Sequence, residues 1–282
     1  MKKIFFVLVI LLLAGAAGTE LLFSAPRKRT EVHFLDVGQG DSVLIESANG
    51  RNILIDGGPD KKVLRRLSEQ LELGERTLDL VVLTHPHADH VTGLNAVLEH
   101  YTVDRILLPP ARSQTPAFKY FLDRARKNKV PVSRITAPFQ AQISPQCRLN
   151  FLYPRQERKF NNLNNASLVS RLKCSDLSFL FTGDIEAEVE KKIMSEEVEL
   201  DSDVLKVAHH GSADSSIGKF LEEVSPELAV ISAGEDNELG HPSLRTVKKL
   251  KRTGAEILRT DRSGTITIEK REDKWAVSPE NK

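Results

Sequence analysis

The chain has 282 residues, of which 40% are apolar and 28% charged, and its formal net charge is +1. These fractions are those of an ordinary globular protein and exclude a disordered or fibrous chain. The near-zero net charge gives no overall basic field of the kind that is typical of nucleic-acid-binding proteins.

Residues 1–25 have the features of a targeting segment. Two lysines stand near the start, residues 4–13 form an uninterrupted apolar stretch, and residues 14–18 are small. This order is typical of a signal peptide. Apolar residues resume at 21–23, so an uncleaved N-terminal membrane anchor of about 20 residues is the alternative. In both cases residues 26–30 form a linker, and we expect a protein that is secreted, periplasmic or anchored to the outer face of the cytoplasmic membrane.

Short apolar strands separated by turns come first in the remaining chain. They are predicted at residues 32–37, 42–46 and 52–55, and an apolar helical spacing follows at 61–73. Strands and helices then alternate, with strands at 78–83, 105–108, near 132, 143 and 149, 168–172, 177–181, 204–207, 228–231, 256–258 and 265–269, and helices at 92–100, 115–128, 187–194, 217–224 and 243–252. This order predicts two packed sheets flanked by helices. We expect one domain over residues 31–270 and a polar C-terminal tail over 271–282.

The most informative stretch is residues 84–90, Thr-His-Pro-His-Ala-Asp-His, directly after an apolar strand. Imidazole and carboxylate are the ligands that zinc and similar divalent ions prefer. In an extended segment His85 and His87 point to the same side, and the proline between them favours extended backbone, so both can bind one ion. Asp89 and His90 follow and can serve a second ion. The stretch therefore predicts a metal-dependent hydrolase.

Other predicted strands end in similar side chains. Asp56, Asp184 and the pair His209 and His210 each follow an apolar strand, and His241 follows another strand after a loop. Ligands at the ends of buried strands can converge on one rim of a sheet. We therefore expect these residues to join the histidine stretch at one site.

The two cysteines, Cys147 and Cys174, lie at the ends of two predicted strands. They can pair in an oxidising compartment. Their distance in space cannot be read from the sequence, so a disulfide and two free thiols both stay open. The predicted metal site needs neither.

Four further motifs carry a family resemblance: residues 34–42 (Phe-Leu-Asp-Val-Gly-Gln-Gly-Asp-Ser), 54–58 (Leu-Ile-Asp-Gly-Gly), 164–168 (Asn-Asn-Ala-Ser-Leu) and 209–212 (His-His-Gly-Ser). Together with the histidine stretch, they make the chain similar to the metallo-β-lactamase superfamily over roughly residues 31–270. Within that superfamily it resembles the hydrolase domain of the ComEC-type competence DNA-uptake proteins. The resemblance implies an α/β (α+β) fold, a four-layered αβ/βα sandwich of two mixed β-sheets flanked by helices, with the site at the edge between the sheets. Because the many membrane spans of the uptake channel are missing from this sequence, we expect a stand-alone, exported relative.

The resemblance also implies a ligand set for two divalent metal ions. One ion would be bound by His85, His87 and His209, the second by Asp89, His90 and His241, with Asp184 as the carboxylate that bridges them. Three polar residues are expected to support the ligands from behind: Asp56, Asn165 and Ser167.

Asp89 and His210 are the expected catalytic residues. His210 would donate to a phosphate oxygen or protonate a leaving group. The choice between His209 and His210 as the ligand stays open. The turn over residues 36–42 is expected to shape the entrance of the site, and a plain glycine-rich hairpin is the alternative.

One feature departs from the superfamily pattern. The superfamily usually has another histidine ligand shortly before the strand that ends at Asp184, but no histidine lies between His100 and His209. We therefore expect one of the two ions to be bound weakly. Manganese is an alternative to zinc, because a site with fewer nitrogens and more oxygens suits harder ions.

The expected reaction is hydrolysis of a phosphodiester by a metal-activated hydroxide, with DNA as the first substrate to consider. A phosphodiesterase that acts on small or cell-envelope phosphoesters is the alternative, because removal of residues 1–25 leaves no net charge and a processive nuclease would need a basic track. A non-catalytic metal-binding accessory of DNA uptake is a further alternative. A β-lactamase is disfavoured, because that branch generally lacks a histidine at the position of His90.

Overall fold

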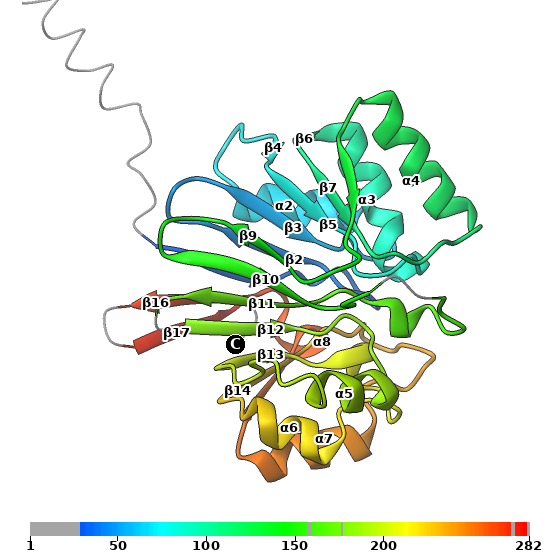
Figure 1. Cartoon of the computed structure of the whole chain (residues 1–282). Helices are drawn as coiled ribbons and strands as arrows, with labels where there is room; N and C mark the ends of the chain where they lie inside the picture. The colour runs from blue at the N-terminus through cyan, green and yellow to red at the C-terminus, as the bar shows by residue number, and fades with distance from the viewer. Residues whose placement is uncertain (1–28, 157–158, 176, 272–273, 281–282) are drawn as a thin grey trace, which may run out of the picture.

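Two mixed β-sheets lie face to face at the centre of the molecule, and helices cover the outer face of each sheet (Figure 1). The computed structural model describes residues 29–156, 159–175, 177–271 and 274–280. The predicted targeting segment therefore lies outside the described residues. Within these ranges, no helix has the length and apolar composition that a membrane span requires.

The first sheet contains strands from both ends of the described chain. Its strand order is β17 (Lys274–Pro279), β16 (Ile266–Arg271), β1 (Glu31–Phe34), β2 (Val43–Glu46), β3 (Asn52–Ile55), β5 (Leu80–Val82), β7 (Ile106–Leu108) and β8 (Val132–Arg134). The strands from β17 to β3 pair in antiparallel fashion, and those from β3 to β8 are parallel.

The second sheet repeats this division. Its order is β15 (Glu256–Arg259), β14 (Leu228–Ile231), β13 (Val204–Lys206), β12 (Leu177–Phe181), β11 (Val169–Cys174), β10 (Cys147–Tyr153) and β9 (Phe139–Gln142). The strands from β9 to β12 are antiparallel, and those from β12 to β15 are parallel. A small parallel pair joins β4 (Thr77–Leu78) to β6 (Thr102–Val103).

Helices complete the four layers. On the first sheet lie α2 (Lys62–Gln70), α3 (Ala88–His100) and α4 (Pro116–Lys127), and their apolar side chains share a core with that sheet. On the second sheet lie α5 (Ala187–Met194), α6 (Gly218–Val224) and α7 (Leu244–Thr253), which share another core with it. Shorter turns are η1 (Asn164–Ala166), η2 (Ala208–Gly211) and α8 (Thr260–Ser263). The predicted four-layered αβ/βα sandwich is confirmed.

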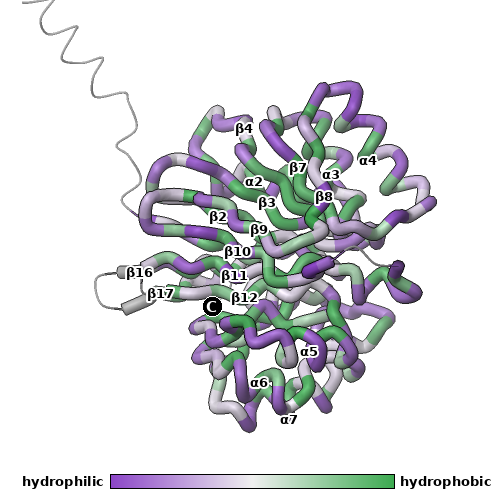
Figure 2. Tube along the Cα trace, viewed as in Figure 1, coloured by the Kyte–Doolittle hydropathy of each residue, from purple (hydrophilic) through white to green (hydrophobic). Residues whose placement is uncertain are grey.

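The apolar runs of the sequence follow from this layering. In β2, Val43 and Ile45 face the core between the sheets, whereas Leu44 faces the core under the helices. A strand that is covered on both faces needs apolar residues at every position, since successive side chains point to opposite faces. Figure 2 shows apolar residues along the central strands and mostly hydrophilic residues on the outer turns of the helices.

Several predicted elements differ in extent from the structure, and two of the differences bear on the site or the sheet. The helix predicted at 92–100 begins at Ala88, so Asp89 and His90 lie in its first turn. The stretch predicted as a polar tail contains β17, which pairs with β16 along the edge of the first sheet. An alternating edge strand with one exposed face contains many polar residues, which is why its composition resembled a tail.

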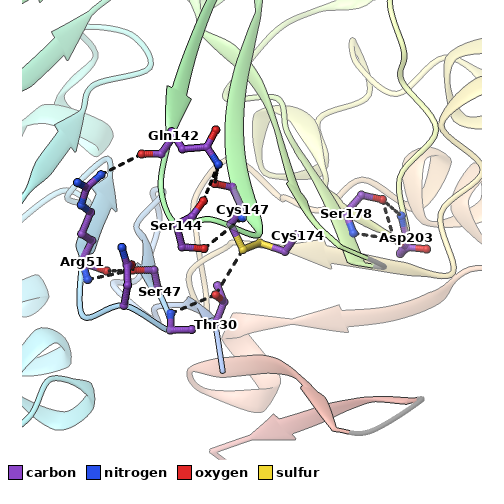
Figure 3. Close-up of a disulfide and its surroundings, with 11 residues drawn as sticks. Thr30, Ser47, Arg51, Gln142, Ser144, Cys147, Cys174, Ser178 and Asp203 are labelled. Atoms are coloured by element: carbon purple, nitrogen blue, oxygen red, sulfur yellow. Dashed lines mark hydrogen bonds between the residues drawn. A yellow bond between two sulfur atoms is a disulfide. The ribbon is translucent and has the colours of Figure 1, made fainter. Parts of the chain in front are cut away.

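The two cysteines are joined by a disulfide (Figure 3). Cys147 and Cys174 lie opposite each other on the antiparallel strands β10 and β11. Thr30, where the described chain enters the first sheet, has its hydroxyl 3.4 Å from the Cys147 sulfur. The disulfide therefore lies where the N-terminal part of the domain meets the second sheet.

Candidate metal centre

Parallel strands of both sheets end at a common edge, and polar side chains gather there. Asp56 follows β3 and His85 follows β5 in the first sheet. Asp184 follows β12 and His210 follows β13 in the second sheet. The carboxyl ends of neighbouring parallel strands lie on the same side of a sheet, which is where ligands bind in folds of this kind. Residues far apart in the sequence thus come within contact distance.

Four side chains form a compact group: Asp89, His90, Asp184 and His210. The Nε2 atoms of His90 and His210 each lie 3.3 Å from Oδ2 of Asp184. Oδ2 of Asp89 lies 3.2 Å from His210 Nε2 and 3.8 Å from His90 Nε2. Four ligands at zinc-bond lengths in a tetrahedron are about 3.3–3.6 Å apart. The spacing of this group therefore fits a divalent cation at its centre.

The hydrogen bonding of the group supports the same conclusion. His90 Nε2, His210 Nε2 and Asp184 Oδ1 are buried and make no hydrogen bond. Buried polar atoms nearly always have a partner, so the unpaired nitrogens of His90 and His210, which both approach Asp184 Oδ2, indicate a position for a ligand. A set of two imidazoles and two carboxylates suits zinc, and its two oxygens also suit manganese.

A second pair of histidines lies near the same Asp184 oxygen. His85 Nε2 and His87 Nδ1 are 3.1 Å apart, and His85 Nε2 is 3.9 Å from Asp184 Oδ2. His85 is fully buried, whereas His87 is partly open to solvent. Two imidazole nitrogens and a shared carboxylate oxygen can hold a second cation.

His209 and His241 lie beside the four-residue group without belonging to it. The His209 ring is 5.6 Å from the His241 ring and 6.2 Å from the His210 ring, measured between centroids. The Asn164 amide nitrogen lies 3.3 Å from His209 Nε2, and the same amide donates to Glu186. His210, which was predicted to donate a proton, thus occupies the place in the four-residue group that was predicted for His241.

Charge within the site favours a cation. Burial alone would raise the pKa of Asp184, but the imidazoles of His210 and His90 lower it well below its usual range. Burial alone would lower the pKa of His90, but the surrounding carboxylates raise it well above its usual range. Burial lowers the pKa of His85 well below its usual range, so its lone pair stays available. The carboxylates are therefore ionised, and they attract positive charge to the centre of the group.

Asp56 holds His90 in place from behind. Its Oδ2 accepts a hydrogen bond from His90 Nδ1 at 2.7 Å and another from the Thr84 hydroxyl at 2.6 Å. Its Oδ1 accepts the Thr84 backbone N–H at 2.7 Å. Because Asp56 holds the proton on Nδ1, Nε2 is the nitrogen that would give up its proton to bind a cation, as in most metal-binding histidines.

Asn165 and Ser167 fix the loop that carries Asp184. The Ser167 hydroxyl accepts the Asp184 backbone N–H at 3.0 Å, and the Asn165 side-chain oxygen accepts the Glu186 backbone N–H at 2.9 Å. Tyr153 donates to the carbonyl of Asn165 at 3.0 Å. These bonds set the position of the carboxylate that His85, His90 and His210 all approach.

Comparisons with known proteins agree with this geometry. The family model described as the metallo-beta-lactamase superfamily matches residues 35–148. The chain is 32% identical over 265 residues to ComE operon protein 3 from Bacillus subtilis, an alignment that covers 87% of this chain and 34% of that protein. It is 32% identical over 245 residues to Competence protein ComA from Neisseria gonorrhoeae, with coverage of 86% and 33%.

This chain contains a metallo-β-lactamase domain. The metallo-β-lactamase fold protein YhfI from Bacillus subtilis aligns with a TM-score of 0.57 at 14% identity, over 86% of this chain and 100% of that one. At that identity the likeness bears on the fold alone. The chain spans about a third of the length of the two competence relatives. The chain is thus related to competence proteins over the length of its metallo-β-lactamase domain.

In this metallo-β-lactamase domain, Asn164 lies near the position of the missing histidine ligand. It contacts His209 and also lies close enough to His87 to influence the pKa of that imidazole, which burial lowers. The buried Oδ1 of Asn164 makes no hydrogen bond. An amide oxygen is a weaker and harder ligand than an imidazole nitrogen, so the His85 and His87 side of the site offers fewer nitrogens than the superfamily pattern.

Asp41 and Lys206 are functional residues that were not predicted. Lys206 is buried and forms an ion pair with Asp41, and its ammonium group also donates to the Gly183 carbonyl at 3.3 Å. Asp41 Oδ1 lies 3.2 Å from His210 Nδ1, which also lies 3.0 Å from the Ser232 carbonyl oxygen. The sequence did carry a signal, because a lysine inside an apolar strand is almost never buried unless it is paired.

The backbone conformation selects which of two adjacent histidines faces the metal position. His209 and His210 both have positive φ, 52° and 51°. Residues other than glycine rarely adopt this left-handed conformation, and two in succession indicate local strain of the kind found at functional sites. The double bend places the buried His210 in the four-residue group and leaves His209 beside Asn164.

Glycine is required where α3 approaches the end of β3. A Cβ on Gly93 would lie 1.8 Å from the Gly57 carbonyl oxygen. Real Cβ atoms do not approach backbone oxygen so closely. This contact lets the first turn of α3, which carries Asp89 and His90, lie directly against the strand that ends at Asp56.

Proposed function

We propose that this domain is an exported metal-dependent phosphodiesterase that hydrolyses DNA. The observation that carries the proposal is the group of Asp89, His90, Asp184 and His210, whose ligand atoms lie within 4.8 Å of one another and include the unpaired Nε2 atoms of both histidines. A second pair of imidazoles shares Asp184 with that group. Two neighbouring cation positions with a shared carboxylate are typical of phosphatases and nucleases. The resemblance of residues 34–42, 54–58, 164–168 and 209–212 to ComEC-type DNA-uptake proteins supports DNA as the substrate.

Zinc or manganese ions bound at these positions would lower the pKa of a water molecule and offset the charge that develops on phosphoryl oxygens. The protein's part is to fix the ligands before the substrate arrives. Asp184 is held by the Ser167 hydroxyl, His90 by Asp56, and His210 by Asp41 and the Ser232 carbonyl.

Asp89 is the member of the group that is most open to solvent, with 31% of its side chain exposed. Its carboxylate lies at the mouth of the group, where it can orient an attacking water by accepting its hydrogen bond. The buried Nε2 of His210 is better placed to bind a cation than to reach a leaving group.

We also propose that the domain acts outside the cytoplasm. The disulfide between Cys147 and Cys174 supports this, because stable disulfides occur mainly in oxidising compartments. The positively charged start and apolar stretch of residues 1–25 agree with export. Fractionation of cells that produce the full chain with a C-terminal tag tests the proposal, and recovery of the tagged protein in the cytoplasmic fraction would contradict it.

The enzymatic proposal is tested with purified protein, single-stranded and duplex DNA, and a panel of small phosphodiesters, with zinc or manganese added. Asp184→Asn keeps the shape of the side chain but removes the shared charge. It should lose bound metal, measured by elemental analysis, together with DNA hydrolysis. Asp123→Asn, an exposed substitution of the same kind on α4, is the control and should keep both. Intact DNA under every condition, alongside turnover of another ester, would defeat the proposal.

One observation favours a phosphodiesterase that acts on small or cell-envelope esters. Without residues 1–25 the chain carries no net charge, whereas a processive nuclease needs a basic track along its substrate. The same panel separates the two functions, because this alternative predicts turnover of small diesters with no preference for DNA. A non-catalytic accessory would bind metal and hydrolyse none of the esters.

A further inference from the structure

A cavity of about 560 Å³ lies beside the metal centre, between two loops that the mechanism does not use. One wall is the loop after β7, with Pro110, Ala111 and Arg112, and the other is the loop before η1, with Lys159, Phe160 and Leu163 among its residues. The volume is within the range of about 300–1,000 Å³ that is typical of ligand sites.

The cavity is connected to the metal centre through one turn of chain. Leu163 lines the cavity, and the next residue, Asn164, contacts His209 at 3.3 Å. Asn164 and Asn162 both donate to the Glu186 carboxylate, at 3.3 Å and 2.9 Å, two residues beyond Asp184. A chain that lies in the cavity would therefore continue past Asn164 toward His209 and the loop that carries Asp184.

Both walls are held in place by hydrogen bonds or packing. The Arg134 guanidinium donates to the carbonyls of Pro109 and Ala111, at 2.8 Å and 3.0 Å. Phe160 is half-buried, because it packs against the core of the second helical layer while it also lines the cavity. The site is therefore shaped before a ligand binds, which lowers the entropic penalty of binding.

Two cations stand on opposite walls of the cavity. Arg112 and Lys159 are both exposed and line the cavity. A guanidinium and an ammonium group bind phosphate oxygens through charge-assisted hydrogen bonds. The apolar surface between them, which includes the Phe160 ring, suits the face of a nucleobase.

We propose that this cavity binds the nucleotide next to the scissile phosphate of a single-stranded nucleic acid, with its phosphate on Arg112 and Lys159 and its base against Phe160. The inference rests on the proposed phosphodiesterase function and names the substrate form for that site. The proposal also explains how the domain could bind nucleic acid without a basic track. The two cations Arg112 and Lys159 can hold one nucleotide even though the chain has no overall basic charge. A duplex fits poorly, because its bases are paired and cannot reach the apolar surface.

Binding of a fluorescein-labelled single-stranded oligodeoxynucleotide, followed by fluorescence anisotropy, tests the proposal with the full mature chain in zinc or manganese. The double variant Arg112→Ala with Lys159→Ala should bind at least ~10-fold more weakly. Its slope of log Kd against log salt should be shallower by ~1.4. Phe160→Leu keeps an apolar side chain without the aromatic face and should weaken binding ~5-fold or more.

The control is Lys251→Ala with Arg252→Ala, which removes the same two kinds of charge at the far end of α7. It should bind like the wild type, and thermal unfolding of each variant shows whether the fold is kept. Unchanged binding by the Arg112 and Lys159 variant, or equal binding of a blunt duplex, would overturn the inference.

Failure of the two proposals can be told apart with a small chromogenic phosphodiester that cannot fill the cavity. If the wild type turns over this ester but binds no oligonucleotide, the nucleotide site is refuted and the phosphodiesterase stands. If no ester is turned over but oligonucleotide binding depends on Arg112 and Lys159, the site is supported and the catalytic proposal fails.

Discussion

Lys206 and Asp41 form a buried ion pair directly behind His210. At most 4% of either side chain is exposed, and Asp41 also lies 3.2 Å from His210 Nδ1. The pair joins the turn before β2 in the first sheet to β13 in the second. Burial alone would raise the pKa of Asp41, but Lys206 and His210 lower it. The carboxylate therefore stays charged and orients the imidazole across the space between the sheets.

Replacing one residue of the ion pair should lower the free energy of unfolding far more than replacing both. Lys206→Met leaves a buried carboxylate without its cation, and the free energy of unfolding should fall by ~3–5 kcal/mol. The double variant Lys206→Met with Asp41→Asn should recover much of this loss. Urea unfolding of the two single variants and the double variant measures the coupling, with the exposed Lys219→Met as the control. Additive losses would show that the pair is not a unit.

Asp56→Asn should weaken metal binding without unfolding the domain. Asp56 has a φ of 58°, a conformation that asparagine tolerates almost as well as aspartate. The amide keeps the shape but accepts the His90 N–H less strongly, and loss of such a partner typically reduces metal affinity ~10–100-fold. Competition with a chromogenic chelator measures the affinity, and Asp60→Asn, in an exposed loop, is the matched control. Equal affinities in the two variants would contradict the role given to Asp56.

The fold was predictable because the central strands are buried on both faces. Such strands need apolar residues at every position, and the sequence shows these as continuous apolar runs. Val43, Leu44 and Ile45 reveal a covered strand without any knowledge of its neighbours. The edge strand β17 lacks that signal, since only pairing with β16 makes it a strand. The start of α3 was misplaced because the turn over Ala88 to His90 contains metal ligands, whose polarity hides the helical spacing.

The sequence predicted which residue types gather at the candidate site. It predicted less well which way each side chain points. His85 and His87 follow from alternation along an extended segment, and the structure brings them together. The inward placement of His210, with His209 beside Asn164, depends on two successive positive φ angles. No local pattern specifies these angles. The importance of Asp41 likewise depends on Lys206, more than 160 residues away in the sequence.

Stability should depend on pH through Glu190. This buried carboxyl group lies on α5 and accepts the backbone N–H groups of Ser216 and Ile217, at 2.5 Å and 2.8 Å. Burial raises its pKa from 4.5 to about 7. The folded state therefore binds the proton more tightly than the unfolded state. The stabilisation is complete below pH 4.5 and is lost as the pH rises through about 7, by up to ~3 kcal/mol.

Glu190→Gln isolates this effect, because the amide resembles the protonated carboxyl. The free energy of unfolding of the wild type should fall between pH 5 and pH 8 relative to that of the variant. Urea unfolding of both proteins at several pH values in this range gives the difference. Other titrating groups are shared and cancel in the comparison. Parallel pH profiles would rule out Glu190 as the source.

The disulfide should contribute a large part of the stability. Cys147 and Cys174 are separated by 27 residues in the sequence. In the chain-entropy model, closing a loop of this length lowers the conformational entropy of the unfolded chain. This raises the free energy of unfolding by ~3.5 kcal/mol. Reduction should therefore lower the urea midpoint of the wild type by a corresponding amount. The double variant Cys147→Ser with Cys174→Ser should match the reduced protein and no longer respond to the reductant. A wild-type midpoint that stays constant when thiol titration shows both cysteines free would contradict this, and it would also weaken the case that the domain needs an oxidising compartment.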